Sequence, residues 1–281
     1  GSEMCIRDSI YVVGSTYTTT TKSDAVFVKF DTDGTHIWSR QWGTDESDSL
    51  NAVAHTAGAF WAVGYTAGAG GTRDIAVVKI TESSGLPHLD NAWCLQTNGD
   101  DRAFCVLASG NNLTIAATSD NFGDNHTNII LLQLDTSPAN PAIVTSRFCE
   151  IGTNCTVTGL STTPSGLYAI CGSYANKPLY VEAQPGGGFY PFAYGGPNLT
   201  QGAFTDAASG GDHNYLAGWA DKAESMWSAL NCDSDDASFT VSSLTSSWTA
   251  PTQTVSDLSW SSEDVTPSGS GGTEGLIVRP H

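Results

Sequence analysis

The sequence has no apolar run long enough to span a bilayer, although 40% of its residues are hydrophobic. Basic residues are also scarce, because 11 Lys and Arg stand against 29 Asp and Glu and give a formal net charge of −18. Such a surface repels phosphates, so a nucleic-acid partner and an anionic membrane surface are both disfavoured. We expect a soluble, monomeric protein that binds no nucleic acid and does not insert into membranes.

Motifs for catalysis and for metals are missing as well. The chain contains no GxSxG, no P-loop, no GxGxxG after a strand, and no CxxC or Cys/His spacing of the kind that binds zinc. We therefore predict no cofactor and no metal site, with calcium as the open alternative. The runs DTDG from Asp31 and DSDD from Asp233 resemble parts of calcium loops, but turn formation by Asp and Gly explains them better.

Residues 1–9, GSEMCIRDS, differ from everything that follows. Gly1 and Ser2 look like a cloning remnant, and MCIRDS looks like the translation of a sequencing adaptor in a metagenomic reading frame. We treat residues 1–9 as a non-native leader and exclude them from fold reasoning. Residues 10–281 then form a single domain, since one repeat extends through all of them.

That repeat is clearest between Leu50 and Trp93, where LNAVA, FWAVGYT, DIAVVKI and DNAWCLQ alternate with turn residues and predict four short strands. The second of these strands recurs as YVVG, WAVG, TIAA, YAIC and YLAG. Its copies begin at Tyr11, Trp61, Thr114, Tyr168 and Tyr215, so 47 to 54 residues separate successive copies. Four-stranded units repeated at this period are typical of a β-propeller.

We predict an all-β, five-bladed propeller of four-stranded antiparallel blades. The strand rich in small residues (LNAVA, FCVLA, VTGLS, FTDAA, VSDLS) fits nearest the axis, where the blades converge. Residues 48–96, 101–148, 155–194 and 202–244 then form four blades. The fifth combines QTVSDLS near the C-terminus with residues 10–42, so that the termini share one blade and hide exposed edges. The alternative is a larger propeller that has lost blades.

Segments such as YVVGST, SDAVFVKFDTDG and IWSRQWG resemble the SBBP-type propeller repeat and, more distantly, NHL-type repeats. The resemblance covers roughly residues 10–110 and weakens beyond them. It implies a propeller fold and a location on or outside the cell surface, but no defined activity.

Six cysteines remain once the leader is excluded, and an even number favours disulfides in an oxidising compartment. We therefore expect at most one or two free thiols among them. Cys155 and Cys171 flank the turn STTPSG and could pair across a hairpin. Cys94 with Cys105 and Cys149 with Cys155 also look like hairpin pairs, but the propeller register weakens both, because those segments would connect an outer strand to the next inner one. Cys232 is the sixth cysteine.

An aromatic residue stands at or just beyond the end of the second strand in four of the units. Rings repeated in this way would offer flat platforms for stacking on sugars, while the alternative is packing between neighbouring blades. The predicted ligand-binding residues are Tyr17, Tyr65, Tyr174 and Trp219.

Two carboxylates fall at equivalent positions of neighbouring inner strands. Asp206 and Asp257 stand where other units have Ala52, Cys105 and Gly159, so they are expected to meet near the axis. Paired carboxylates serve as acid and base in glycoside cleavage or as ligands for a hard cation, and hydration of a central channel is the alternative.

Together these observations predict a secreted or cell-surface binding module whose ligand is a glycan or another surface molecule. One alternative is a carbohydrate-active enzyme, a glycoside hydrolase or lyase, that uses Asp206 and Asp257. Another is a structural protein-interaction propeller. We predict no catalytic residue in the first case.

Overall fold

The computed structural model describes residues 9–17, 22–44, 46–67, 71–122, 126–138, 141–194, 201–210, 213–220, 227–229, 233–236 and 240–243. In these ranges every regular element is a β-strand, which confirms the all-β prediction. None of the described residues belongs to a helix that is long and apolar enough to cross a membrane.

Three successive segments each fold into a complete four-stranded antiparallel sheet. The inner strand of each sheet pairs with the second, the second with the third, and the third with the outer one. The predicted four-stranded unit is therefore confirmed three times. The three sheets consist of β4 (Asp48–Thr56), β5 (Ala59–Ala67), β6 (Arg73–Ser83) and β7 (Leu86–Gln96); β8 (Asp101–Ser109), β9 (Asn112–Ser119), β10 (Asn128–Asp135) and β11 (Ala142–Glu150); and β12 (Cys155–Thr162), β13 (Tyr168–Tyr174), β14 (Lys177–Ala183) and β15 (Phe189–Tyr194).

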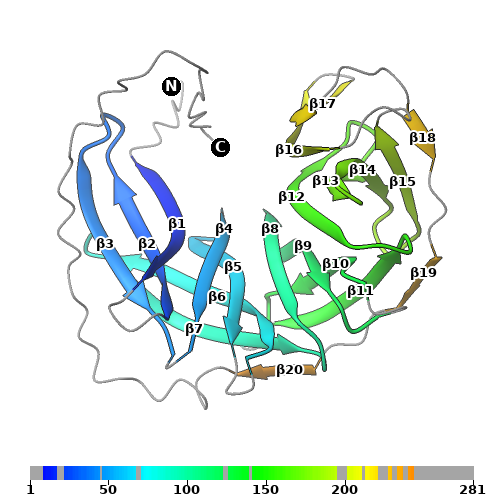
Figure 1. Ribbon diagram of the computed structural model, residues 1–281. Coiled ribbons are helices and arrows are strands. Elements are labelled where there is room, and N and C mark those ends of the chain that lie inside the picture. Colours follow the sequence, from blue (N-terminus) through cyan, green and yellow to red (C-terminus); the bar gives the residue numbers. More distant parts are fainter. Residues whose placement is uncertain are drawn as a thin grey trace.

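Two smaller sheets flank these three along the chain. One is formed by β1 (Ile10–Tyr17), β2 (Ser23–Phe30) and β3 (His36–Trp42), and the other by β16 (Gly202–Gly210) and β17 (His213–Ala220). Figure 1 shows the five sheets in chain order along an arc, with β4, β8, β12 and β16 toward its inner side. These inner strands contact one another in succession.

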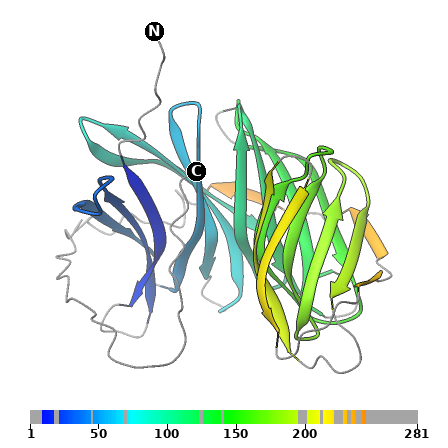
Figure 2. The same ribbon diagram turned by 90° about the horizontal axis from the view of Figure 1, so that it is seen from above.

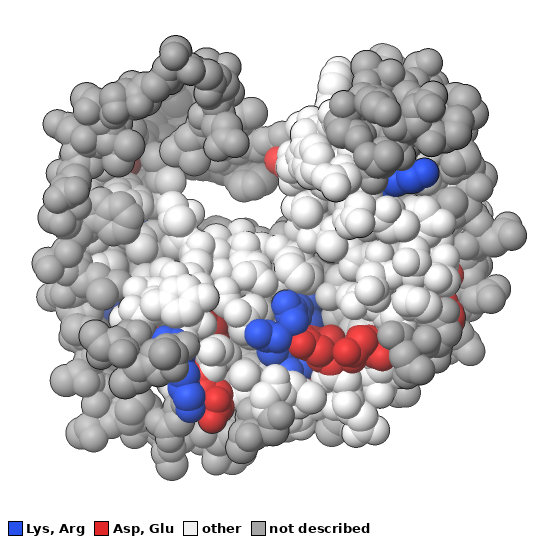
Figure 3. Space-filling view, viewed as in Figure 1, with Lys and Arg blue, Asp and Glu red and all other residues white. Residues whose placement is uncertain are grey.

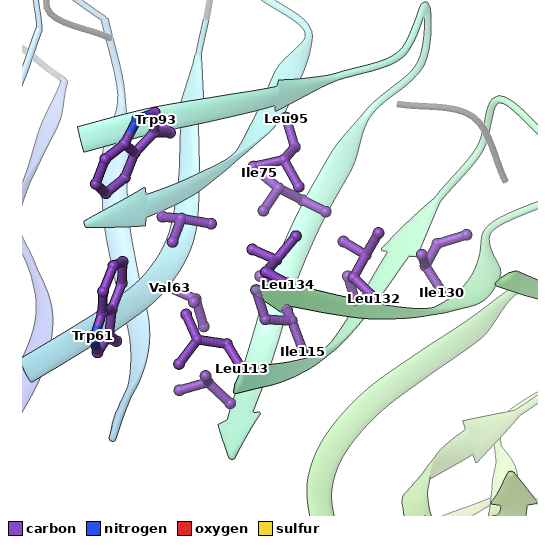
Figure 4. Packing of buried hydrophobic residues seen from close by; sticks show 14 of the residues in the cluster. Trp61, Val63, Ile75, Trp93, Leu95, Leu113, Ile115, Ile130, Leu132 and Leu134 are labelled. Atoms are coloured by element: carbon purple, nitrogen blue, oxygen red, sulfur yellow. The ribbon is translucent and has the colours of Figure 1, made fainter. Parts of the chain in front are cut away.

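The sheets pack face to face, because alternate residues of every strand point to the preceding or to the following sheet. In β5, Trp61 and Val63 join the cluster shared with β8–β11, whereas Ala62 joins the cluster shared with β1–β3. Figure 4 shows the first of these clusters, in which Trp61 stacks on Trp93 with ring centroids 5.8 Å apart. A third cluster fills the space between β8–β11 and β12–β15. Side chains between sheets therefore form the core.

The fourth predicted blade is wrong in its outer half. The described residues of its expected outer strands, SMWSALN and SFTVSSL, do not pair with β17. The chain instead places β18 (Trp227–Ala229), β19 (Asp233–Asp236) and β20 (Thr240–Ser243) against β15, β11 and β7. Each adds a short fifth strand to the outer edge of a complete sheet, as Figures 1 and 2 show. Covering these edges removes unpaired backbone groups that would otherwise face solvent.

The predicted sharing of one blade by both termini falls largely outside the described residues. Residues 10–42 do form the three predicted strands β1–β3. The segment QTVSDLS, expected as their inner strand, lies outside the described part, as do residues 1–8.

Candidate functional site

The inner strands carry one repeated irregularity, a β-bulge that leaves a single residue unpaired with the second strand. The bulged residues are Asn51, Phe104, Thr158 and Thr205. Each is followed by the position that the sequence comparison aligned, namely Ala52, Cys105, Gly159 and Asp206. Bulges re-aim side chains, and here they do so at the same level of four successive strands.

Two of the bulged side chains hydrogen-bond to the next inner strand. The amide Nδ2 of Asn51 donates to the backbone oxygen of Ala103 at 2.7 Å, and Oγ1 of Thr158 donates to the backbone oxygen of Phe204 at 2.5 Å. Both acceptors stand immediately before the bulge of the following sheet. The bulge is thus a device that joins neighbouring sheets along the inner side of the arc.

Asp206 lies on this inner side, next to two cysteines. A Cβ atom added to Gly159 would lie 2.7 Å from the Cys171 sulfur and 3.0 Å from Cα of Asp206. Burial raises the pKa of the Cys105 thiol to about 12, and the nearby Cys171 and Asp206 add to that increase. Asp257 lies outside the described residues, so the predicted carboxylate pair is not placed.

The predicted ring of aromatics separates into different environments. Tyr17 and Trp219 are 80% and 54% exposed, whereas Tyr65 and Tyr174 are half-buried. The register makes Tyr65 and Trp219 equivalent, because each stands two residues after the partner of Ala52 or Asp206. Tyr174 lies on the opposite face of its sheet and packs against the third cluster.

Tyr65 belongs to a charged network between two sheets. The guanidinium carbons of Arg73 and Arg102 lie over its ring, 5.1 Å and 5.9 Å from the centroid. Both arginines pair with Asp100, and the hydrogen bond from Arg102 is the main reason that the pKa of Asp100 is lowered. Figure 3 shows basic side chains gathered beside acidic ones on this face. The ring of Tyr65 is therefore largely occupied by the protein itself.

Sequence reasoning missed a second repeated feature, the aspartate that begins an inner strand. Asp48 and Asp101 are 2% and 0% exposed. Each accepts hydrogen bonds from the backbone N–H and the hydroxyl of a threonine four residues earlier, Thr44 or Thr97. The signal was present in the sequence as Thr-x-x-x-Asp in the loops GTDESDS and QTNGDDR.

A second aspartate faces each of these from the preceding sheet. Asp24 lies near Asp48, and Asp74 lies near Asp101, and each neighbour raises the pKa of the buried carboxyl that it faces. Burial is the largest cause in both cases, and it raises the pKa of Asp101 to about 6. The carboxyl of Asp101 therefore takes up a proton in mildly acidic solution.

The cysteine prediction is corrected by the structure. Cys94, Cys105, Cys155 and Cys171 are not disulfide-bonded, so every hairpin pair considered is wrong, and at least four thiols replace the one or two expected. Cys149 alone among the described cysteines is disulfide-bonded. Cys232 lies outside the described residues. These thiols face the sheet interfaces or the inner strands, where Cys serves as a small apolar residue.

The two acidic runs have different settings. Asp31 of DTDG closes the β2–β3 turn by accepting hydrogen bonds from the N–H groups of Asp33 and Thr35, as the turn interpretation requires. The run DSDD forms β19. Within the described ranges, no group of three or more His, Cys, Asp and Glu side chains is placed to hold a metal ion.

No protein-family model matches this chain, and no curated protein sequence matches it.

Proposed function

We propose that the chain is a closed five-bladed propeller that acts as a carbohydrate-binding module on or outside the cell. The fold part of the proposal is supported by exposed hydrophobic side chains on the two sheets at the ends of the arc. On β17, Tyr215 is 60% exposed, although its register equivalent Trp61 is 4% exposed against the following sheet. On β1, Val12 is exposed where its equivalent Ala62 is buried.

The closing strand in this proposal is the segment around VSDLS, with Ser256 as its bulge and Asp257 next to it. Leu258 then takes the position of Val106, Leu160 and Ala207, which are all buried. Replacing Leu258 by Asp in the full chain should lower the melting temperature by several degrees, since it places a charge between sheets. An unchanged melting temperature would refute closure by this strand.

The binding part of the proposal is carried by one observation, the exposed indole of Trp219. Closure covers Tyr215 but leaves Trp219 at the rim, because the equivalent Tyr65 is only half-buried between two complete sheets. An exposed ring with a polar N–H edge can stack on a sugar and donate a hydrogen bond. Tyr17 offers a second exposed ring at the end of β1.

The location outside the cell rests on the resemblance of the repeats, since the unbonded thiols give no support to an oxidising compartment. The alternative of an enzyme that uses Asp206 and Asp257 is favoured by the inner-side position of Asp206, but a partner carboxylate is not among the described residues. A structural interaction domain is the third candidate.

A glycan array probed with the wild-type protein, the Trp219→Ala variant and the Tyr190→Ala variant tests the binding function. Tyr190 is a matched control, because it is similarly exposed but lies on β15. We expect Trp219→Ala alone to weaken glycan binding at least tenfold, with the melting temperature unchanged. Turnover of a bound polysaccharide would select the enzyme, and silence of the wild-type protein on all glycans would reject the carbohydrate ligand.

A further inference from the structure

The loops that lead from one sheet to the next are fastened by buried carboxyl groups at two junctions. At the junction of β1–β3 with β4–β7, the elements packed around Asp48 present Thr44, Thr66 and Asp24. Gln41 donates to Asp24 from the outer strand. The ion pair of Lys22 with Glu46 lies in the same region at the surface, with both side chains more than one third exposed.

The next junction repeats this arrangement. Asp101 faces Thr97, Ser119 and Asp74, and Gln96 donates to Asp74 at 3.0 Å. The nearby cations are engaged elsewhere, because Arg73 and Arg102 both pair with Asp100. Neither Asp48 nor Asp101 has an ion pair with a base among the described residues, and the donors that stabilise its charge are hydroxyl and backbone N–H groups.

The third junction supplies an internal comparison. Register places Asn128 where the first two junctions have Asp24 and Asp74, and Cys155 where they have Asp48 and Asp101. Asn128 is fully buried and donates to the backbone oxygens of Phe122 and His126. A junction of this fold is thus built without any carboxyl group, and the two acidic junctions are not needed for the fold as such.

We infer that the Asp24–Asp48 and Asp74–Asp101 junctions are pH-sensitive latches, in which uptake of a proton by the buried carboxyls of Asp48 and Asp101 stabilises the packing of neighbouring sheets in weak acid. Asp48 and Asp101 are 2% and 0% exposed, so burial disfavours the charged form of each carboxyl, and uptake of a proton removes that penalty. The inference does not depend on the proposed glycan function.

The direction of the effect follows from linkage. A carboxyl whose pKa is raised in the folded protein binds protons more tightly there than in the unfolded chain, so folding strengthens as pH falls through the folded value. With a folded value of about 6 for Asp101, its share is roughly a fiftyfold gain in the folding constant between pH 7 and pH 4. Asp48 contributes in the same direction.

The test is denaturant unfolding of the full chain at several pH values between 4 and 7.5, for wild type, Asp48→Asn, Asp101→Asn and the control Asp33→Asn. Asp33 is an exposed turn residue, so its variant removes the same formal charge without touching a junction. We expect the wild type and the control to gain stability on acidification, and Asp101→Asn to lose most of the roughly fiftyfold share of that gain that Asp101 supplies. Equal pH dependence in Asp101→Asn and wild type would overturn the inference.

A second measurement keeps the inference testable if Asp101→Asn does not fold. Carbon NMR of the wild-type carboxyl groups reports the titration of Asp101 directly, and Asp74→Asn should move its midpoint downward because a like charge is removed. A midpoint for Asp101 below about 4.5 in the wild type, close to the ordinary value for Asp, would refute the latch.

Discussion

The side-chain amide of Asn51 donates a 2.7 Å hydrogen bond to the backbone oxygen of Ala103, 52 residues further along the chain. This bond joins the inner strands of two neighbouring sheets. Asn51 is exposed, yet its amide reaches the next sheet because the bulge turns it out of the alternating pattern of β4. The contact is repeated between Thr158 and Phe204, so it belongs to the fold and not to one sheet.

Replacing Asn51 by Ala should therefore lower the free energy of unfolding by about 1 kcal/mol, the net value of one such hydrogen bond. Urea unfolding measures the change. Asn91→Ala on β7 is the control, because Asn91 is exposed and lies on an outer strand. If both variants lost the same free energy of unfolding, the hydrogen bond from Asn51 to Ala103 would make no specific contribution to stability.

The sequence predicted the strands well because each strand carries its own alternating pattern and turn residues. It also predicted correctly that Ala52, Cys105, Gly159 and Asp206 are equivalent, since the repeat period fixes that register. Beyond Ala220 the pattern failed. Segments of three or four paired residues can satisfy their backbone groups on any free sheet edge, and pattern alone does not choose between edges.

The acidic junctions could not be predicted in full for a different reason. Asp24 and Asp48, like Asp74 and Asp101, lie in the first two residues of strands from different sheets, and only the packing of those sheets brings them near one another. The aromatics at the strand ends show the same limit, because one residue of offset places Tyr174 on the opposite face from Tyr65.

Gly64 is required by a close backbone approach. A Cβ atom there would lie 1.9 Å from the backbone oxygen of Ser49, and Gly172 has the same relation to Thr156. Gly64→Ala should destabilise the protein by about 1–3 kcal/mol through forced displacement of β4. Gly188→Ala is the control, since no atom lies within 4 Å of the Cβ that it would add. Thermal unfolding of the two variants side by side decides; a neutral Gly64→Ala would show that β4 adjusts freely.

Tyr65 should behave as a structural residue. Removing its ring in Tyr65→Ala takes away the contacts with Arg73 and Arg102, which together are worth about 1–2 kcal/mol at a partly exposed site. Tyr65→Phe keeps the ring face and should be nearly neutral. A loss of stability in Tyr65→Ala without a change in glycan binding would show that Tyr65 has a structural role, unlike Trp219. A loss of glycan binding without a loss of stability would show instead that Tyr65 is part of the sugar-binding surface.

The cysteines should be inert in the folded protein. Burial raises the pKa of the Cys155 thiol to about 12 and that of Cys171 to about 11, so the reactive thiolate is scarce at pH 8. Thiol titration of the unreduced protein should find little reaction in buffer and at least four thiols after unfolding in denaturant. Fewer than four thiols in the unfolded sample would contradict the unbonded cysteines.

Stability should fall again in stronger acid because of an opposite set of carboxylates, of which Glu82 is the clearest. Burial alone would raise its pKa, but hydrogen bonds from Lys29 and Tyr11 outweigh burial and lower it. The ionised form of Glu82 is therefore preferred in the folded state. Its contribution to the free energy of unfolding is complete above the ordinary pKa near 4.5 and is lost as the pH falls through the lowered pKa.

Glu82→Gln should lower the free energy of unfolding at pH 7 and should make the loss of stability below pH 4.5 less steep. Glu46→Gln, at a more exposed ion pair, should do neither. Denaturant unfolding at pH 3, 4 and 7 measures both effects. If Glu82→Gln lost stability below pH 4.5 as steeply as the wild type, other carboxylates would be responsible for the acid sensitivity.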